Sequence, residues 1–81
     1  MAPRKKVQDG NEFIFCNGKK ASTIASLKKE IKMLSEQEFL FHVNQEKNDF
    51  HKWIADCIDP MFAENLVGIT DKAKILSALK W

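Results

Sequence analysis

The stretch FLFHVNQEKNDFHKWIADCI, residues 39 to 58, holds both histidines and one of the two tryptophans of this 81-residue chain. Its apolar residues recur at the spacing of one helix face: Phe50, Trp53, Ile54, Cys57 and Ile58. Asn48 is expected to cap this helix, and Asp49 to lie in its first turn, where an acid suits the positive end of the helix dipole. The stretch therefore predicts the centre of a small folded domain.

A second helix is predicted directly before it. Ser35 and Glu38 have the spacing of a capping box, which places Phe39, Leu40 and Val43 on the buried side of the helix. Alternate residues from position 39 to 43 are also apolar, as in a half-buried strand, and so short a run fits either periodicity. The capping box favours the helix.

Three short segments of the stretch resemble a known family: His42-Val43-Asn44, Lys47-Asn48-Asp49-Phe50 and Trp53-Ile54. Together they are similar to the H-x-N…N-D-F-x-x-W-I signature of a small domain of unknown function, found mainly in archaeal and bacterial proteins. The resemblance covers residues 13 to 79. It implies a glycine turn, a leucine-containing helix and a short acidic helix after the signature, but no activity.

The signature residues allow two interpretations. His42, Asn44, Asn48 and Asp49 surround the break between the two central helices, and they could form a pocket for a polar ligand or a partner's backbone. Alternatively, Asn44 ends one helix, Asn48 starts the next and His42 hydrogen-bonds across the turn. The second interpretation is favoured, because short polar side chains at helix ends usually satisfy free backbone groups. Trp53 is expected to be a core residue.

The rest of the chain predicts an α+β domain. Residues 12 to 22 indicate a β-hairpin, in which Asn17-Gly18 suits a two-residue type I′ turn. A helix capped by Ser22 or Thr23 follows. Asp59-Pro60 separates two later helices, and Thr70 is expected to cap the last. The predicted architecture is an N-terminal hairpin packed on four or five short helices.

Length and composition predict a single domain over residues 12–81, preceded by a flexible basic arm and lead-in over residues 1–11. No apolar run approaches the roughly 20 residues that a membrane span needs. The two cysteines, Cys16 and Cys57, lie far apart, and the charged N-terminus does not resemble a signal peptide. These features predict an intracellular protein, in the cytoplasm or a nucleic-acid compartment.

Charge is divided unevenly between the two halves. Residues 1–32 carry eight basic and three acidic side chains, a net charge of +5, whereas residues 33–81 carry a net charge of −3. The basic residues of the first half are Arg4, Lys5, Lys6, Lys19, Lys20, Lys28, Lys29 and Lys32. They suggest contact with the phosphates of a nucleic acid, DNA rather than RNA, although a solvated face would look the same. Because lysine dominates, such binding would not be sequence-specific.

A protein-interaction or structural module is the alternative function. The acidic second half, or an apolar groove near Phe41 and Trp81, would then dock a partner or a second copy of the chain. Substituting either aromatic residue should disturb such a contact, whereas neutralising Lys28, Lys29 and Lys32 should disturb contact with a nucleic acid.

Enzymatic chemistry is not expected. His42, His51, Cys16 and Cys57 lack the close pairing of structural zinc ligands, so neither a metal nor another cofactor is predicted. A cysteine on the buried face of a helix is a poor nucleophile. The three glycines, at positions 10, 18 and 68, form no phosphate-binding loop.

Overall fold

The computed structural model describes residues 6–79 of the chain. Strands come first and helices follow: β1 (Phe13–Ile14), β2 (Lys20–Ala21), α1 (Ile24–Met33), α2 (Glu36–His42), α3 (Asp49–Cys57), α4 (Pro60–Ala63), the 3-10 helix η1 (Glu64–Leu66) and α5 (Lys72–Ala78). β1 and β2 pair antiparallel. The expected α+β class and N-terminal hairpin are therefore confirmed.

The hairpin turn differs from the predicted one. Its loop spans residues 16 to 18 and is closed by the Gly18 N–H, which donates to Phe15 O over 2.9 Å. A type I′ turn needs positive φ at two consecutive residues, but in this loop only Gly18 has one, +87°. Asn17 keeps a negative φ and accepts the Lys19 N–H with its side-chain oxygen over 3.0 Å. The predicted two-residue turn is therefore wrong.

Both predicted starts of the first two helices are confirmed. Thr23 is the N-cap of α1, and Ser26 at the third helical position completes a capping box. Ser35 caps α2 and forms a second box with Glu38, whose carboxylate accepts the Ser35 N–H over 2.9 Å. Each box satisfies backbone donors that have no partner inside the helix.

The C-terminal helices are partly as predicted. Asp59 caps α4 with Pro60 at its first position, as expected from the sequence. The last helix, however, is capped by Asp71 rather than by Thr70. The Asp71 carboxylate accepts the Lys74 N–H over 3.1 Å, so α5 begins one residue later than predicted.

α2 is a helix rather than a strand, which settles the ambiguous run at residues 39 to 43. Phe39, His42 and Val43 point into the core, at the spacing of one helix face. Leu40 and Phe41 lie off that face, with 46% and 57% of their surface exposed. The burial predicted for Leu40 is therefore wrong, because the face that meets the core is narrower than the apolar run.

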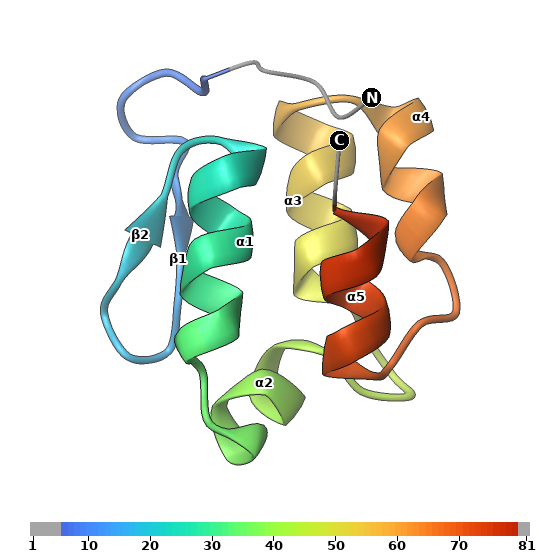
Figure 1. The fold of residues 1–81 in the computed structure, drawn as a ribbon. Helices are drawn as coiled ribbons and strands as arrows, with labels where there is room; N and C mark the ends of the chain where they lie inside the picture. The colour runs from blue at the N-terminus through green and yellow to red at the C-terminus, as the bar shows by residue number, and fades with distance from the viewer. Residues whose placement is uncertain (1–5, 80–81) are drawn as a thin grey trace.

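The core lies where the hairpin and the helices meet. In Figure 1, α1 and α5 stand side by side, with the hairpin beside α1, α4 against α3, and α2 at the bottom of the view. The apolar stripe of α3 is buried at Phe50, Trp53, Ile54 and Ile58, whereas Cys57 is half-buried. No helix within residues 6–79 has the length and apolar character that crossing a membrane requires.

The lead-in before the hairpin packs against the rest of the domain. Val7 is buried, and its N–H donates to Ser22 O over 2.9 Å. Further along, Asn11 O accepts the indole N–H of Trp53 over 2.8 Å. Val7 and Asn11 thus tie the lead-in to both the start of α1 and the middle of α3.

Candidate functional site

The helix α1 presents three lysines on its outer side. Its inner side is fully buried at Ile24, Leu27 and Ile31. Lys29 and Lys32 are exposed, and Lys28, one turn before Lys32, is half-exposed. We call Lys28, Lys29 and Lys32 the α1 lysine surface.

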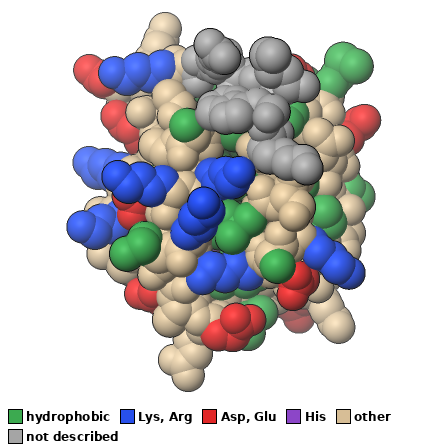
Figure 2. All heavy atoms as spheres, in the orientation of Figure 1, with side chains coloured by type: hydrophobic (Ala, Val, Ile, Leu, Met, Phe, Trp, Pro, Cys, Tyr) green, Lys and Arg blue, Asp and Glu red, His purple; other side chains and the backbone are tan. Residues whose placement is uncertain are grey.

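The α1 lysine surface has no acidic partner among residues 6–79. The ion pair in this range joins Lys47 Nζ to Asp49 over 3.3 Å, and Asp49 also lies 3.0 Å from His42 Nδ1. Figure 2 shows lysine side chains gathered over α1 and the neighbouring hairpin. The positive charge on this face is therefore not neutralised by ion pairs within the described part of the chain.

The other predicted basic residues are spread more widely. Lys20 lies in β2, which packs against α1, but its side chain is exposed because its neighbour Ala21 faces the core. Lys19 is exposed beside the hairpin turn, and Lys6 is exposed at the start of the lead-in. Arg4 and Lys5 lie outside the described residues.

One lysine that sequence reasoning assigned to the acidic half joins the end of α1. Lys72 is the first residue of α5, and its ammonium donates to the carbonyl of Leu34, the C-cap of α1. A cation suits this position because the end of a helix carries partial negative charge. Net charge counted along the chain could not reveal this contact, because it joins residues 38 positions apart.

An acidic side chain lies close to the basic residues of the hairpin. The carboxylate of Glu12 accepts the Gly10 N–H over 3.0 Å. Its own backbone N–H and that of Gly10 lower the pKa of Glu12, and the charges of Lys20 and Lys6 lower it further. Glu12 thus places a negative charge near Lys20 and Lys6, so the surface around the hairpin is not purely basic.

Asn48 has two structural functions at the start of α3. Its side-chain oxygen accepts the His51 N–H over 2.9 Å, which is the predicted N-cap bond. Its amide donates to the carbonyls of Leu66 and Ile69, at 3.2 Å and 3.5 Å. Asn48 therefore joins the start of α3 to the loop before α5.

His42 connects three separate elements. Its Nδ1 lies 3.0 Å from an Asp49 carboxylate oxygen, and its Nε2 accepts the Cys16 N–H over 3.0 Å. Since Nε2 accepts, the proton of the neutral ring is on Nδ1 and is donated to Asp49. The ring is 3% exposed and lies against Phe13, at 5.2 Å between ring centres, and Phe50, at 5.5 Å. His42 bonds across the turn, as the favoured interpretation predicted.

The neighbourhood of Cys16, His42 and Asp49 does not form a nucleophilic triad. The lone pair of His42 Nε2 that would activate the thiol is occupied by the backbone N–H of Cys16. The Cys16 thiol is instead 3.9 Å from Glu38 O. Among residues 6–79, no three side chains of the types that hold metal ions come together.

The aromatic residues of the signature belong to the core. Phe50 is fully buried and Trp53 is 8% exposed. The two are joined through Phe13, whose ring centre lies 5.0 Å from Phe50 and 6.0 Å from Trp53. The core position predicted for Trp53 is confirmed, and neither ring is available as a stacking platform for bases.

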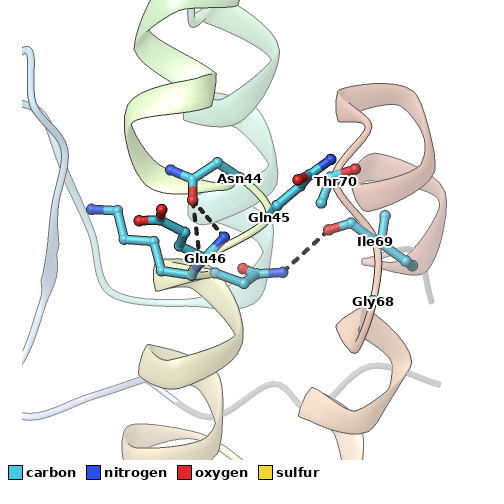
Figure 3. A pocket seen from close by; sticks show the side chains of 8 residues that line it. Asn44, Gln45, Glu46, Gly68, Ile69 and Thr70 are labelled. Carbon is cyan, nitrogen blue, oxygen red and sulfur yellow. Dashed lines mark hydrogen bonds between the residues drawn. The ribbon is translucent and has the colours of Figure 1, made fainter.

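A polar pocket of about 450 Å³ lies between the loop before α3 and the loop before α5. In Figure 3, Asn44, Gln45 and Glu46 line one side, and Gly68, Ile69 and Thr70 line the other. The Asn44 side-chain oxygen accepts two backbone N–H groups of its own loop, at 2.9 Å and 3.2 Å. Because Asn44 and Asn48 bond to backbone groups, the asparagines of this pocket hold the two loops in place.

Comparisons with known proteins provide no relative. The chain matches no protein-family model, and neither the curated proteins nor the solved structures contain a match. Any function must therefore follow from the chain's own contacts and charges.

Proposed function

We propose that this protein binds DNA without sequence specificity and without enzymatic activity, through the α1 lysine surface. The observation that supports the proposal is a set of three lysines on one side of α1, two exposed and Lys28 half-exposed, none of which pairs with a carboxylate in residues 6–79. These lysines can therefore bind phosphates without first losing an ion pair within residues 6–79. Lys19, Lys20, Lys6 and the basic residues of the arm would add contacts around this surface.

The chemistry of the surface favours phosphate contact over base recognition. Lysine is a point charge that does not read base edges bidentately as arginine does, and the only arginine of the chain is Arg4. Three phosphate contacts give a salt slope of about −2.7, so affinity for a duplex should fall about 40-fold between 50 and 200 mM salt. Contacts from the hairpin and the arm would make the slope steeper.

The test is anisotropy of a fluorescent random-sequence duplex at several salt concentrations. The variant Lys28→Gln/Lys29→Gln/Lys32→Gln should weaken binding at 50 mM salt and reduce the salt slope by about 2.7. A control with the same change in net charge, Lys47→Gln/Lys52→Gln/Lys74→Gln, should bind nearly as well as the parent. A chain lacking residues 2–6 measures the contribution of the arm.

Two results would contradict the proposal. One is the absence of binding at 50 mM salt. The other is an equal loss of affinity in the two triple variants, because net charge rather than the α1 lysine surface would then account for binding. A single-stranded RNA probe of equal length tests the preference for DNA.

A protein-interaction module is the second candidate function. It is favoured by the exposed ring of Phe41 on α2, over which Lys47 Nζ lies 4.7 Å from the ring centre. Leu40 beside it is 46% exposed, which gives α2 an uncovered apolar side. Trp81, the other aromatic residue expected there, lies outside the described residues. If α2 mediates self-association, Phe41→Ala should abolish any concentration-dependent increase in sedimentation coefficient, and an unchanged increase would exclude this role.

A further inference from the structure

A shallow groove runs between β1 and α3, and none of the residues that line it belongs to α1. It has a volume of about 360 Å³ and is lined by Phe13 and Ile14 of β1 and by Lys52, Trp53, Asp56 and Cys57 of α3. Its floor is mainly apolar, whereas acidic groups lie at its rim. A hollow with an apolar floor and a charged rim is a typical place for a peptide side chain.

The strand that borders the groove has a free edge. The sheet of residues 6–79 has two strands, so β1 pairs with β2 on one side only. The Phe15 N–H donates to Lys19 O, and Phe13 is paired with Ala21. Because hydrogen-bonding directions alternate along an antiparallel strand, the N–H and C=O of Ile14 point away from β2.

Ile14 is the open position on this edge. The next outward-facing N–H, that of Cys16, is taken by His42 Nε2. On the other side lies Glu12, whose carboxylate accepts the Gly10 N–H over 3.0 Å. No residue in the described range bonds to the outward groups of Ile14, so one donor and one acceptor remain for another chain. This is the geometry that strand addition uses.

The α3 side of the groove determines how long a bound peptide segment can be, and it carries charged side chains. Asp49, Lys52, Trp53 and Asp56 recur at i, i+3, i+4 and i+7, so they form a line about 10 Å long on α3. About three residues of an extended peptide span that distance. Glu12, Asp49 and Asp56 lie along the groove with Lys52, and Asp49 is paired with Lys47 at 3.3 Å, which leaves a net charge of −1. The groove thus favours a cation and repels phosphate.

We propose that this groove binds an extended, positively charged peptide segment of a partner protein, which pairs with Ile14 as an added strand. The residue opposite Ile14 receives two backbone hydrogen bonds. Its neighbours point toward the groove floor, where an apolar side chain covers Trp53 and Cys57. Lysine or arginine side chains of the peptide then meet Asp56 and Glu12 at the rim. A helical ligand does not fit, because the middle of a helix has no free backbone groups for Ile14.

The probe is a fluorescently labelled peptide, Lys-Val-Lys-Val-Lys, with blocked ends, added to the full chain. Binding is followed by anisotropy and by the amide spectrum of isotope-labelled protein. The Ile14 amide signal should shift on binding, and its hydrogen exchange should slow. The same peptide methylated on its central backbone nitrogen cannot donate to Ile14 C=O, and we expect its affinity to fall about fivefold.

Matched variants separate the groove from general charge. Asp56→Asn should weaken binding of the peptide about two- to fivefold, whereas Glu64→Gln, which removes one exposed charge outside the groove, should change it little. The α1 triple glutamine variant should bind the peptide as the parent does, which keeps this test independent of DNA binding. Binding of Glu-Val-Glu-Val-Glu at equal affinity would overturn the proposal. So would the absence of peptide binding at millimolar concentration, or peptide binding that leaves the Ile14 amide unchanged.

Discussion

Replacing Asn48 by aspartate should separate the two functions of that side chain. The substitution keeps an oxygen that accepts the His51 N–H, so the N-cap of α3 is retained. It removes the amide that donates to the carbonyls of Leu66 and Ile69, and it places a carboxylate against these two acceptors. The start of α3 should then lose its connection to the loop before α5.

The expected cost can be estimated from these contacts. Loss of the part-buried bond from Asn48 to Leu66 O, at 3.2 Å, removes about 1 kcal/mol of stability. Leu66 O keeps the Ile69 N–H at 3.3 Å, whereas Ile69 O loses the Asn48 amide as its donor, which costs about 1 to 2 kcal/mol more. A negative charge at the N-cap of a helix returns about 0.5 kcal/mol. We therefore expect Asn48→Asp to lower the free energy of unfolding by about 2 kcal/mol.

Asn44→Asp is the matched control. The same chemical change there keeps the oxygen that accepts the Glu46 and Lys47 N–H groups. It removes only an exposed bond to Leu40 O, which should cost about 0.5 kcal/mol. With a urea slope of about 1 kcal/mol per molar, the unfolding midpoints of the two variants should differ by about 1.5 M when followed by tryptophan fluorescence. Equal midpoints would refute the structural role assigned to the Asn48 amide.

Three further predictions concern other contacts of the fold. His42→Ala removes two hydrogen bonds and leaves a cavity among aromatic rings, so it should lower the free energy of unfolding in urea by about 3 kcal/mol. The control His51→Ala, at a half-buried position, should lower it by less than about 1 kcal/mol. Equal costs would contradict the role of His42 as a bridge between elements. Because folding lowers the pKa of Glu12, its carboxylate stabilises the fold above the ordinary titration range of glutamate, and this contribution is lost as the pH falls through the lowered pKa. Glu12→Gln should therefore flatten the acid end of a plot of stability against pH. An unchanged plot would contradict the effect of the Gly10 and Glu12 N–H groups on this carboxylate. Gly18→Ala should cost about 1 kcal/mol through its positive φ alone, because nothing lies within 4 Å of the added carbon, and a neutral result in thermal unfolding would show that the turn relaxes.

Local signals in the sequence were reliable because their partners are close in the chain. The cap at Thr23, which the sequence left open with Ser22, the box at Ser35, the cap at Asn48 and the break at Asp59 each depend on residues at most three positions away. The turn at Gly18 was predicted at the right place but with the wrong geometry. There the Asn17 side chain bonds to the backbone and leaves one residue, not two, with a positive φ.

Contacts between distant segments could not be predicted in this way. The Asn48 amide reaches a carbonyl 18 residues away, and the Trp53 indole reaches one 42 residues away. The α1 lysine surface could be predicted, because spacing on one helix determines which side chains share a face. The groove beside Ile14 could not be, since it forms only where one edge of β1 meets α3.

The hydrogen bond at Cys16 has a consequence for the dynamics of the hairpin. Cys16 is exposed, yet its backbone N–H donates to the buried His42 on α2. Releasing that amide to solvent requires the hairpin to leave the helices, which would uncover Phe13 and Phe15. Since strands of two residues each are too short to persist alone, the hairpin and the helices should open together as one cooperative unit. Deuterium uptake at the Cys16 amide should therefore report global unfolding, while the thiol of the same residue reacts freely with an alkylating reagent.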